Sequence, residues 1–79
     1  MDDVVRIEFE ERSEQWFVTV YFPDGSSRPE EPFPASGHPN YPKVEQVRDR
    51  VQNVLRYEIV SVSGHAPNGT HYVVEVKPK

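Results

Sequence analysis

The chain has 79 residues, no cysteine and a formal net charge of −4, and 28% of its residues are charged. This length fits a single small domain spanning residues 1–79. The lack of cysteine excludes disulfides and cysteine-based zinc sites, and the acidic total argues against nonspecific nucleic-acid binding, which needs a basic surface.

Two segments near the amino terminus, residues 4–10 and 15–22, alternate between apolar and polar residues. This alternation predicts two strands of a half-buried sheet, and the polar residues between them predict a hairpin with a four-residue loop. The pairs that would place the large apolar residues on one face are Phe9 with Trp16, Ile7 with Val18, and Val5 with Val20. A slip of one residue would expose all of them, so the hydrophobic pattern constrains the register.

Residues 23–42 contain six prolines and predict a long loop, because proline removes the backbone donors that a central strand needs. A short edge strand over residues 26–28, after the Asp24-Gly25 turn, is compatible with this loop. We expect Phe33 and Tyr41 to anchor the loop to the core. The spacing of Pro29 and Pro32 matches a PxxP motif, which is weak support for a peptide-ligand role because proline-rich loops produce it by chance.

Residues 43–56 predict an amphipathic helix. Its apolar residues recur at spacings of three and four: Val44, Val47, Val51, Val54 and Leu55. Pro42 suits the first helical turn.

The last two predicted strands, 58–64 and 71–77, admit two registers. An Asn68-Gly69 two-residue turn is a strong hairpin signal, but it mixes apolar and charged residues on one face. A longer loop places Val62 opposite Val74, Val60 opposite Val76, and Gly64 opposite Tyr72. We favour the longer loop, because burial of one face usually overrides a local turn preference.

These elements predict an α+β domain of two layers in the order ββαββ. One amphipathic helix packs on one face of a mostly antiparallel four-stranded sheet. The order of the strands within the sheet stays open.

The stretches SGHPN and SGHAPN contain His38 and His65, and His71 follows the second stretch. The favoured register places His65 opposite His71, close enough for both to bind one metal ion. Catalytic zinc normally has three protein ligands, so these two histidines are weak candidates and we expect no metal or other cofactor. Serine and histidine occur without an oxyanion-hole motif, and we expect no enzymatic activity.

The sheet face away from the helix is the most promising surface. The residues that we expect to give it apolar character are Phe17, Thr19, Tyr21, Ile59 and Val73. Three interpretations compete for this face. The proline-rich loop could cover it through Phe33 and Tyr41, it could bind a protein or a second copy of the chain, or its aromatics could stack on single-stranded nucleic acid.

We therefore expect a small, non-enzymatic interaction or regulatory module that binds a protein partner or self-associates, through the helix-free sheet face or the proline-rich loop. A nucleic-acid-binding domain using the sheet aromatics with Arg48, Arg50 and Arg56 is a less favoured alternative. A third is an acidic mimic of nucleic acid that presents Glu8, Glu10, Glu11, Glu14, Glu30 and Glu31.

The amino-terminal stretch MDDVVRIEFEE is acidic and lacks the basic region of a signal peptide. No apolar run approaches the roughly 18 residues that a membrane span needs. We expect a soluble, cytoplasmic protein with no membrane partner.

Overall fold

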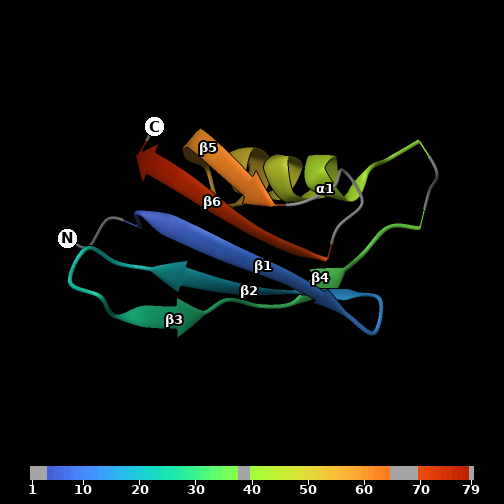
Figure 1. The fold of residues 1–79 in the computed structure, drawn as a ribbon, viewed down its shortest axis with the longest axis horizontal. Coiled ribbons are helices and arrows are strands. Elements are labelled where there is room, and N and C mark those ends of the chain that lie inside the picture. The colour runs from blue at the N-terminus through green and yellow to red at the C-terminus, as the bar shows by residue number, and fades with distance from the viewer. Residues whose placement is uncertain (1–3, 38–39, 65–69, 79) are drawn as a thin grey trace.

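The computed structural model describes residues 4–37, 40–64 and 70–78. Within them the chain forms a six-stranded antiparallel sheet with one helical segment on one of its faces (Figure 1). The sheet order is β3-β2-β1-β6-β5, and β4 also pairs with β2. The strands are β1 (Arg6–Arg12), β2 (Gln15–Tyr21), β3 (Ser27–Pro29), β4 (Phe33–Pro34), β5 (Tyr57–Gly64) and β6 (His71–Pro78).

The predicted α+β class is confirmed, but the four-strand count and the ββαββ order are wrong. The proline-rich segment contributes two short strands, β3 and β4, which pair with opposite ends of β2. Prolines are tolerated there because both strands lie at the edge of the sheet, where one side of the backbone needs no partner. Between them, the Glu30 amide donates to the Val18 carbonyl at 2.9 Å.

The β1–β2 hairpin has a shorter turn than the sequence predicts. Its register pairs Phe9 with Val18 and Ile7 with Val20, a shift of two residues from the predicted pairs. Ser13 and Glu14 have φ values of 52° and 63°, as both residues of a type I′ turn require. A shift of two residues keeps every side chain on its predicted face, so the core survives the wrong register.

The two residues before β1 depart from the predicted alternation. Val5 is 41% exposed, and Val4 is buried in its place. The Val5 amide donates to the Tyr21 carbonyl, and the Val5 carbonyl accepts from the Val76 amide, so the backbone stays tied to both neighbouring strands.

The predicted helix is divided into α1 (Lys43–Asp49) and a π-helical segment, η1 (Arg50–Val54). Val47 and Val51 are fully buried. The wider π turn, in which the Leu55 amide donates to the Arg50 carbonyl, changes which side chains face the sheet. Leu55 packs against the core, whereas Val54 is 51% exposed.

The β5–β6 hairpin has the register of the longer predicted loop at two pairs, Val62 with Val74 and Gly64 with Tyr72. A β-bulge between Ile59 and Ser61 then changes the pattern. Ile59 pairs with Val76 and packs against the core, while Val60 is 60% exposed. The predicted Val60–Val76 pair is therefore wrong, because a bulge inserts one residue and reverses the faces beyond it.

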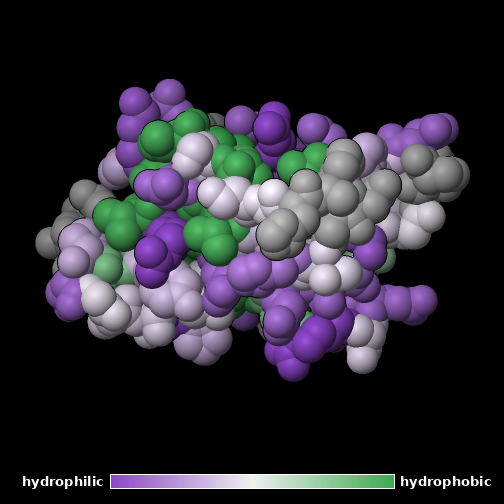
Figure 2. All heavy atoms as spheres, in the orientation of Figure 1, coloured by the Kyte–Doolittle hydropathy of each residue, from purple (hydrophilic) through white to green (hydrophobic). Residues whose placement is uncertain are grey.

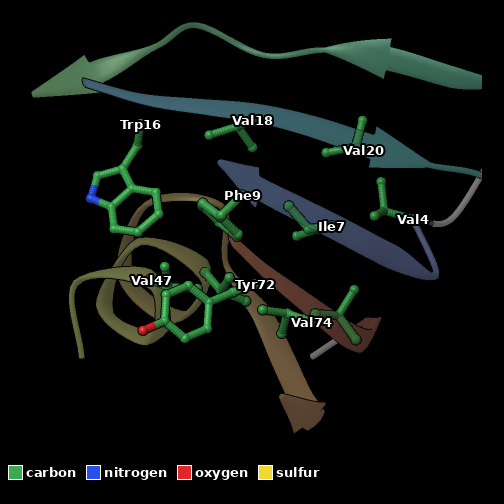
Figure 3. Close-up of a cluster of buried hydrophobic side chains, with 11 residues drawn as sticks. Val4, Ile7, Phe9, Trp16, Val18, Val20, Val47, Tyr72 and Val74 are labelled. Atoms are coloured by element: carbon green, nitrogen blue, oxygen red, sulfur yellow. The ribbon is translucent and has the colours of Figure 1, made fainter. Parts of the chain in front are cut away.

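The core lies between the sheet and the helix (Figure 3). Strands β1, β2 and β6 each contribute inward side chains, and Val47 approaches them from the helix. Phe9 and Trp16 pack edge to face with their ring centroids 6.3 Å apart. In the described part of the chain, no helix is long and apolar enough to cross a membrane.

Candidate functional site

The helix-free face of the sheet carries most of the side chains that the sequence singles out. Phe17, Thr19 and Tyr21 alternate along β2 on the face opposite the buried Trp16, Val18 and Val20, and each is half-buried. Val73 of β6 is half-buried on the same face. Ile59 is absent from this group, because the bulge in β5 turns it towards the core.

A hydrogen-bonded network crosses the centre of this face. The Tyr21 hydroxyl donates to Glu8 Oε1 at 3.1 Å, and His71 Nε2 lies 2.8 Å from Glu8 Oε2. The hydrogen bond from His71 lowers the pKa of Glu8, so this carboxyl group stays ionised. An ionised carboxylate can only accept, so Nε2 of His71 carries the proton. The same carboxylate raises the pKa of Tyr21, whose ionisation would break a hydrogen bond and add a second anion.

Arginine side chains cover the two aromatic rings of this face. The Arg6 guanidinium carbon lies 4.6 Å from the centre of the Tyr21 ring, and that of Arg12 lies 4.3 Å from the centre of the Phe17 ring. A nucleobase would have to displace these guanidinium groups to stack on either ring. The face therefore carries a polar network beside half-buried aromatic rings.

The two predicted loop anchors lie on the other side of the sheet. Phe33 stacks against Trp16 with ring centroids 6.4 Å apart, and it also packs edge to face on Phe9. Tyr41 is 37% exposed, and its backbone carbonyl accepts a hydrogen bond from Gln46. The interpretation that these residues fold the proline-rich loop over the helix-free face is therefore wrong.

The histidine hypothesis can be followed only in part. His38 and His65 lie outside the described residues. Among the described residues, no group of three His, Cys, Asp or Glu side chains could hold a metal ion. The described histidine, His71, bonds to Glu8.

Gln46 organises the junction between the helix and the proline-rich loop. Its amide group is buried, with 4% of the residue exposed, and makes four hydrogen bonds. Oε1 accepts from Trp16 Nε1 at 3.1 Å and from the Ser36 amide at 2.9 Å. Nε2 donates to the carbonyls of Ser36 and Tyr41, each at 3.0 Å. One side chain thus joins the sheet, the loop and the helix.

Two hollows lie along this junction, between the helix and the segment that contains β3 and β4. The first has a volume of about 150 Å³ and is lined by Phe33, Pro34, Ser36, Tyr41, Gln46, Asp49, Arg50 and Val54. The second has a volume of about 180 Å³ and is lined by Val18, Glu30, Glu31, Arg50, Val54 and Leu55. We call the two together the loop–helix groove.

Arg50 and Val54 line both hollows and so mark the point where they adjoin. The Arg50 guanidinium carbon lies 4.3 Å from the centre of the Phe33 ring, which holds the side chain against the loop. Val54 exposes about half of its surface here. Tyr41 and Asp49 also line the first hollow, where partial burial and the neighbouring Asp49 carboxylate raise the pKa of Tyr41.

The sequence reasoning missed this groove. Gln46 lies beside Val47 in the helical sequence and reads there as an ordinary polar residue. The sequence nevertheless indicates that a polar partner for the tryptophan is needed. The chain has a single tryptophan, and the N–H of a buried tryptophan needs a hydrogen-bond acceptor. The identity of that acceptor depends on where the loop lies, which the local pattern does not show.

The comparisons with known proteins found no family model, no curated protein and no solved structure that matches this chain.

Proposed function

We propose that this chain is a small, non-enzymatic protein-interaction module of the cytoplasm, and that it binds an extended segment of a partner protein in the loop–helix groove. The observation that carries this proposal is the pair of adjoining hollows that share Arg50 and Val54. A partly apolar surface, lined by aromatic, proline and valine side chains, favours a protein partner.

The size of each hollow suits recognition of a single side chain. The volumes are about 150 and 180 Å³. A cavity of about 150 Å³ holds a benzene ring, so each hollow fits one side chain of a peptide.

The walls of the groove are held in place before any partner binds. Gln46 fixes the loop at Ser36 and Tyr41, and the Ala35 amide donates to the Glu14 carbonyl at 2.9 Å. Strand β4 pairs with β2 at the same end. A preformed surface supports tighter binding, because less conformational freedom is lost on association.

The two alternative functions receive less support from the geometry. The sheet aromatics Phe17 and Tyr21 face away from the helix, so Arg48, Arg50 and Arg56 do not share a surface with them. The acidic residues are divided in a similar way. Glu8 and Glu10 lie on the helix-free face, whereas Glu11 pairs with Lys43 on the helix side.

A selection experiment tests the proposal. A library of short random peptides displayed on phage would be selected against the immobilised protein. Each enriched peptide would then be measured for binding to the wild type, Val54→Asp and Val60→Asp. We expect Val54→Asp to weaken binding by about tenfold or more, as truncation of a buried interface residue does. Val60→Asp is the matched control, because Val60 is also an exposed valine, 60% against 51%, and lines neither hollow.

Two results would contradict the proposal. One is that no peptide is enriched. The other is that the enriched peptides bind Val54→Asp as tightly as they bind the wild type, which would place their site elsewhere on the protein.

A further inference from the structure

We propose that the loop–helix groove selects segments in which a lysine or arginine lies close to an apolar ring, either proline or an aromatic residue. The basic side chain occupies the hollow beside Glu30 and Glu31, and the ring occupies the hollow beside Phe33 and Tyr41. This inference rests on the proposed function, because it names the chemistry of the segment that the groove binds.

The hollow beside Glu30 and Glu31 combines an apolar lining with two carboxylates. Val18, Val54 and Leu55 supply the apolar lining. Lysine and arginine side chains match this arrangement, since their methylene groups pack on apolar surfaces while the charged end reaches polar groups. An aliphatic residue would make no ion pair with the Glu31 carboxylate, and an acidic residue would be repelled by both carboxylates.

The carboxylates of Glu30 and Glu31 differ in their availability to a ligand. Glu30 accepts from Arg28 Nε at 3.2 Å, and only 28% of its side chain is exposed. Glu31 is exposed and forms no ion pair with any of the described cationic side chains. Glu31 is therefore the carboxylate that is available to an incoming ammonium or guanidinium group.

Arg50 does not reverse this preference. Its guanidinium lies against the Phe33 ring, at the boundary between the two hollows. Because Glu30 is already paired with Arg28, the groove lining leaves two carboxylates, those of Glu31 and Asp49, against this one guanidinium. The excess of negative charge attracts a cationic segment and disfavours an acidic one.

The hollow beside Phe33 and Tyr41 suits a ring. Two aromatic side chains and Pro34 line it, and grooves of this kind bind the proline rings of extended peptides. The Tyr41 carbonyl is already occupied by Gln46, whereas Tyr41 as a whole is 37% exposed and lines the hollow. The ring would therefore pack mainly through apolar contacts.

The test begins with the peptides that bind in a Val54-dependent way. We expect lysine or arginine to be over-represented at one position of these peptides relative to the unselected library, with proline or an aromatic residue nearby. The affinity of one such peptide would then be measured by fluorescence polarisation, together with that of its variant in which the basic residue is replaced by glutamate.

Charge reversal of Glu31 makes the test specific. We expect Glu31→Lys to weaken binding of the basic peptide by about fivefold, the effect of one exposed ion pair, and to strengthen binding of the glutamate variant. Glu75→Lys is the matched control, since it makes the same change of charge at an exposed residue of β6 outside the groove lining. We expect it to change neither affinity by more than about twofold.

The outcomes separate this inference from the proposed function. Peptides that depend on Val54 but show no preference for basic residues would overturn the inference and leave the proposed function standing. Equal effects of Glu31→Lys and Glu75→Lys would also overturn it, because the charge effect would then be nonspecific. If no peptide depends on Val54, the proposed function itself fails, and the inference fails with it.

Discussion

Gln46 shows how one side chain sets the position of a loop. Its amide group forms hydrogen bonds with the Trp16 side chain on the sheet and with the backbone of Ser36 and Tyr41 in the loop. A buried amide is costly unless it is hydrogen-bonded, and here both its oxygen and its nitrogen have partners. The position of the proline-rich loop therefore depends on a residue of the helix.

We expect Gln46→Ala to lower the free energy of unfolding by about 2–4 kcal/mol, because it leaves buried polar groups without a partner and removes packing. Urea denaturation followed by the fluorescence of Trp16 measures this loss. Hydrogen exchange of the Ser36 amide should also accelerate, because this amide donates to Gln46.

Asn53→Ala is the control for this prediction. Asn53 also carries an amide on the helical segment, but its bond to Asp49 is exposed. We expect a change of less than about 0.5 kcal/mol. Similar losses of unfolding free energy in Gln46→Ala and Asn53→Ala would contradict the conclusion that the buried Gln46 amide stabilises the fold.

Glu8 makes stability depend on pH. The hydrogen bond from His71 lowers its pKa in the folded protein, so its contribution to stability is fully present above the pKa that it has in the unfolded chain. The contribution is lost as the pH falls through the lowered pKa. Because 37% of the Glu8 side chain is exposed, we expect a contribution of less than about 1 kcal/mol.

The measurement is a series of urea denaturations from neutral pH down to about pH 3, on the wild type and on Glu8→Gln. The stability difference between the two proteins should be largest at the neutral end and should shrink towards the acidic end. Parallel curves over the whole range would show that Glu8 makes no pH-dependent contribution.

At the scale of elements, hydrophobic alternation predicts the strands but not their irregularities. The faces of β1 and β2 follow from their sequences, because burial of one face requires a period of two. The two-residue turn at Ser13 and Glu14 does not follow from the sequence, since these residue types seldom adopt two successive positive φ values. The bulge at Val60 also could not be predicted from the sequence, because it depends on how β5 fits against β6.

Strand β4 shows a second limit of the sequence reasoning. The prolines of this segment argue only against a central strand, and a short edge strand over residues 26–28, close to the observed β3, is compatible with them. Whether a segment lies at an edge is decided by the arrangement of the whole sheet, which the residues of the loop do not encode locally. The groove could not be predicted for the same reason, because its walls come from elements far apart in the sequence.

Gly64 provides a test of how β5 packs on β6. Gly64 lies opposite Tyr72, and a Cβ atom on it would clash with the Tyr72 ring, including Cε1 at 2.8 Å. Tyr72 is 2% exposed, so its ring has little freedom to move away. We expect Gly64→Ala to destabilise the protein by about 1–3 kcal/mol in urea denaturation.

Gly37→Ala is the matched control for Gly64→Ala. A Cβ atom at Gly37 would meet nothing within 4 Å. We expect its effect to stay within about 0.5 kcal/mol. If Gly64→Ala changes the free energy of unfolding as little as Gly37→Ala does, β5 and β6 do not approach each other as closely at Gly64 as the structure describes.

At the scale of the whole molecule, the two faces of the sheet have different characters. The face away from the helix is a polar network centred on Glu8, and the other face holds the core and, at its edge, the loop–helix groove. Figure 2 shows one side of the molecule, on which hydrophobic residues gather over β5, β6, the helix and the start of β1, while hydrophilic residues cover most of the remaining β1–β3 region. The proposal that a partner binds at the groove is consistent with this difference between the two faces.

The most direct test of this account maps the binding site on the protein itself. The strongest peptide from the selection would be titrated into ¹⁵N-labelled protein while the backbone amide signals are recorded by NMR. We expect the largest shifts at residues of the groove, such as Phe33, Arg50 and Val54, with little change at Thr19 and Val73. The largest shifts at Thr19 and Val73, with the groove signals unmoved, would contradict the account and place binding on the helix-free face.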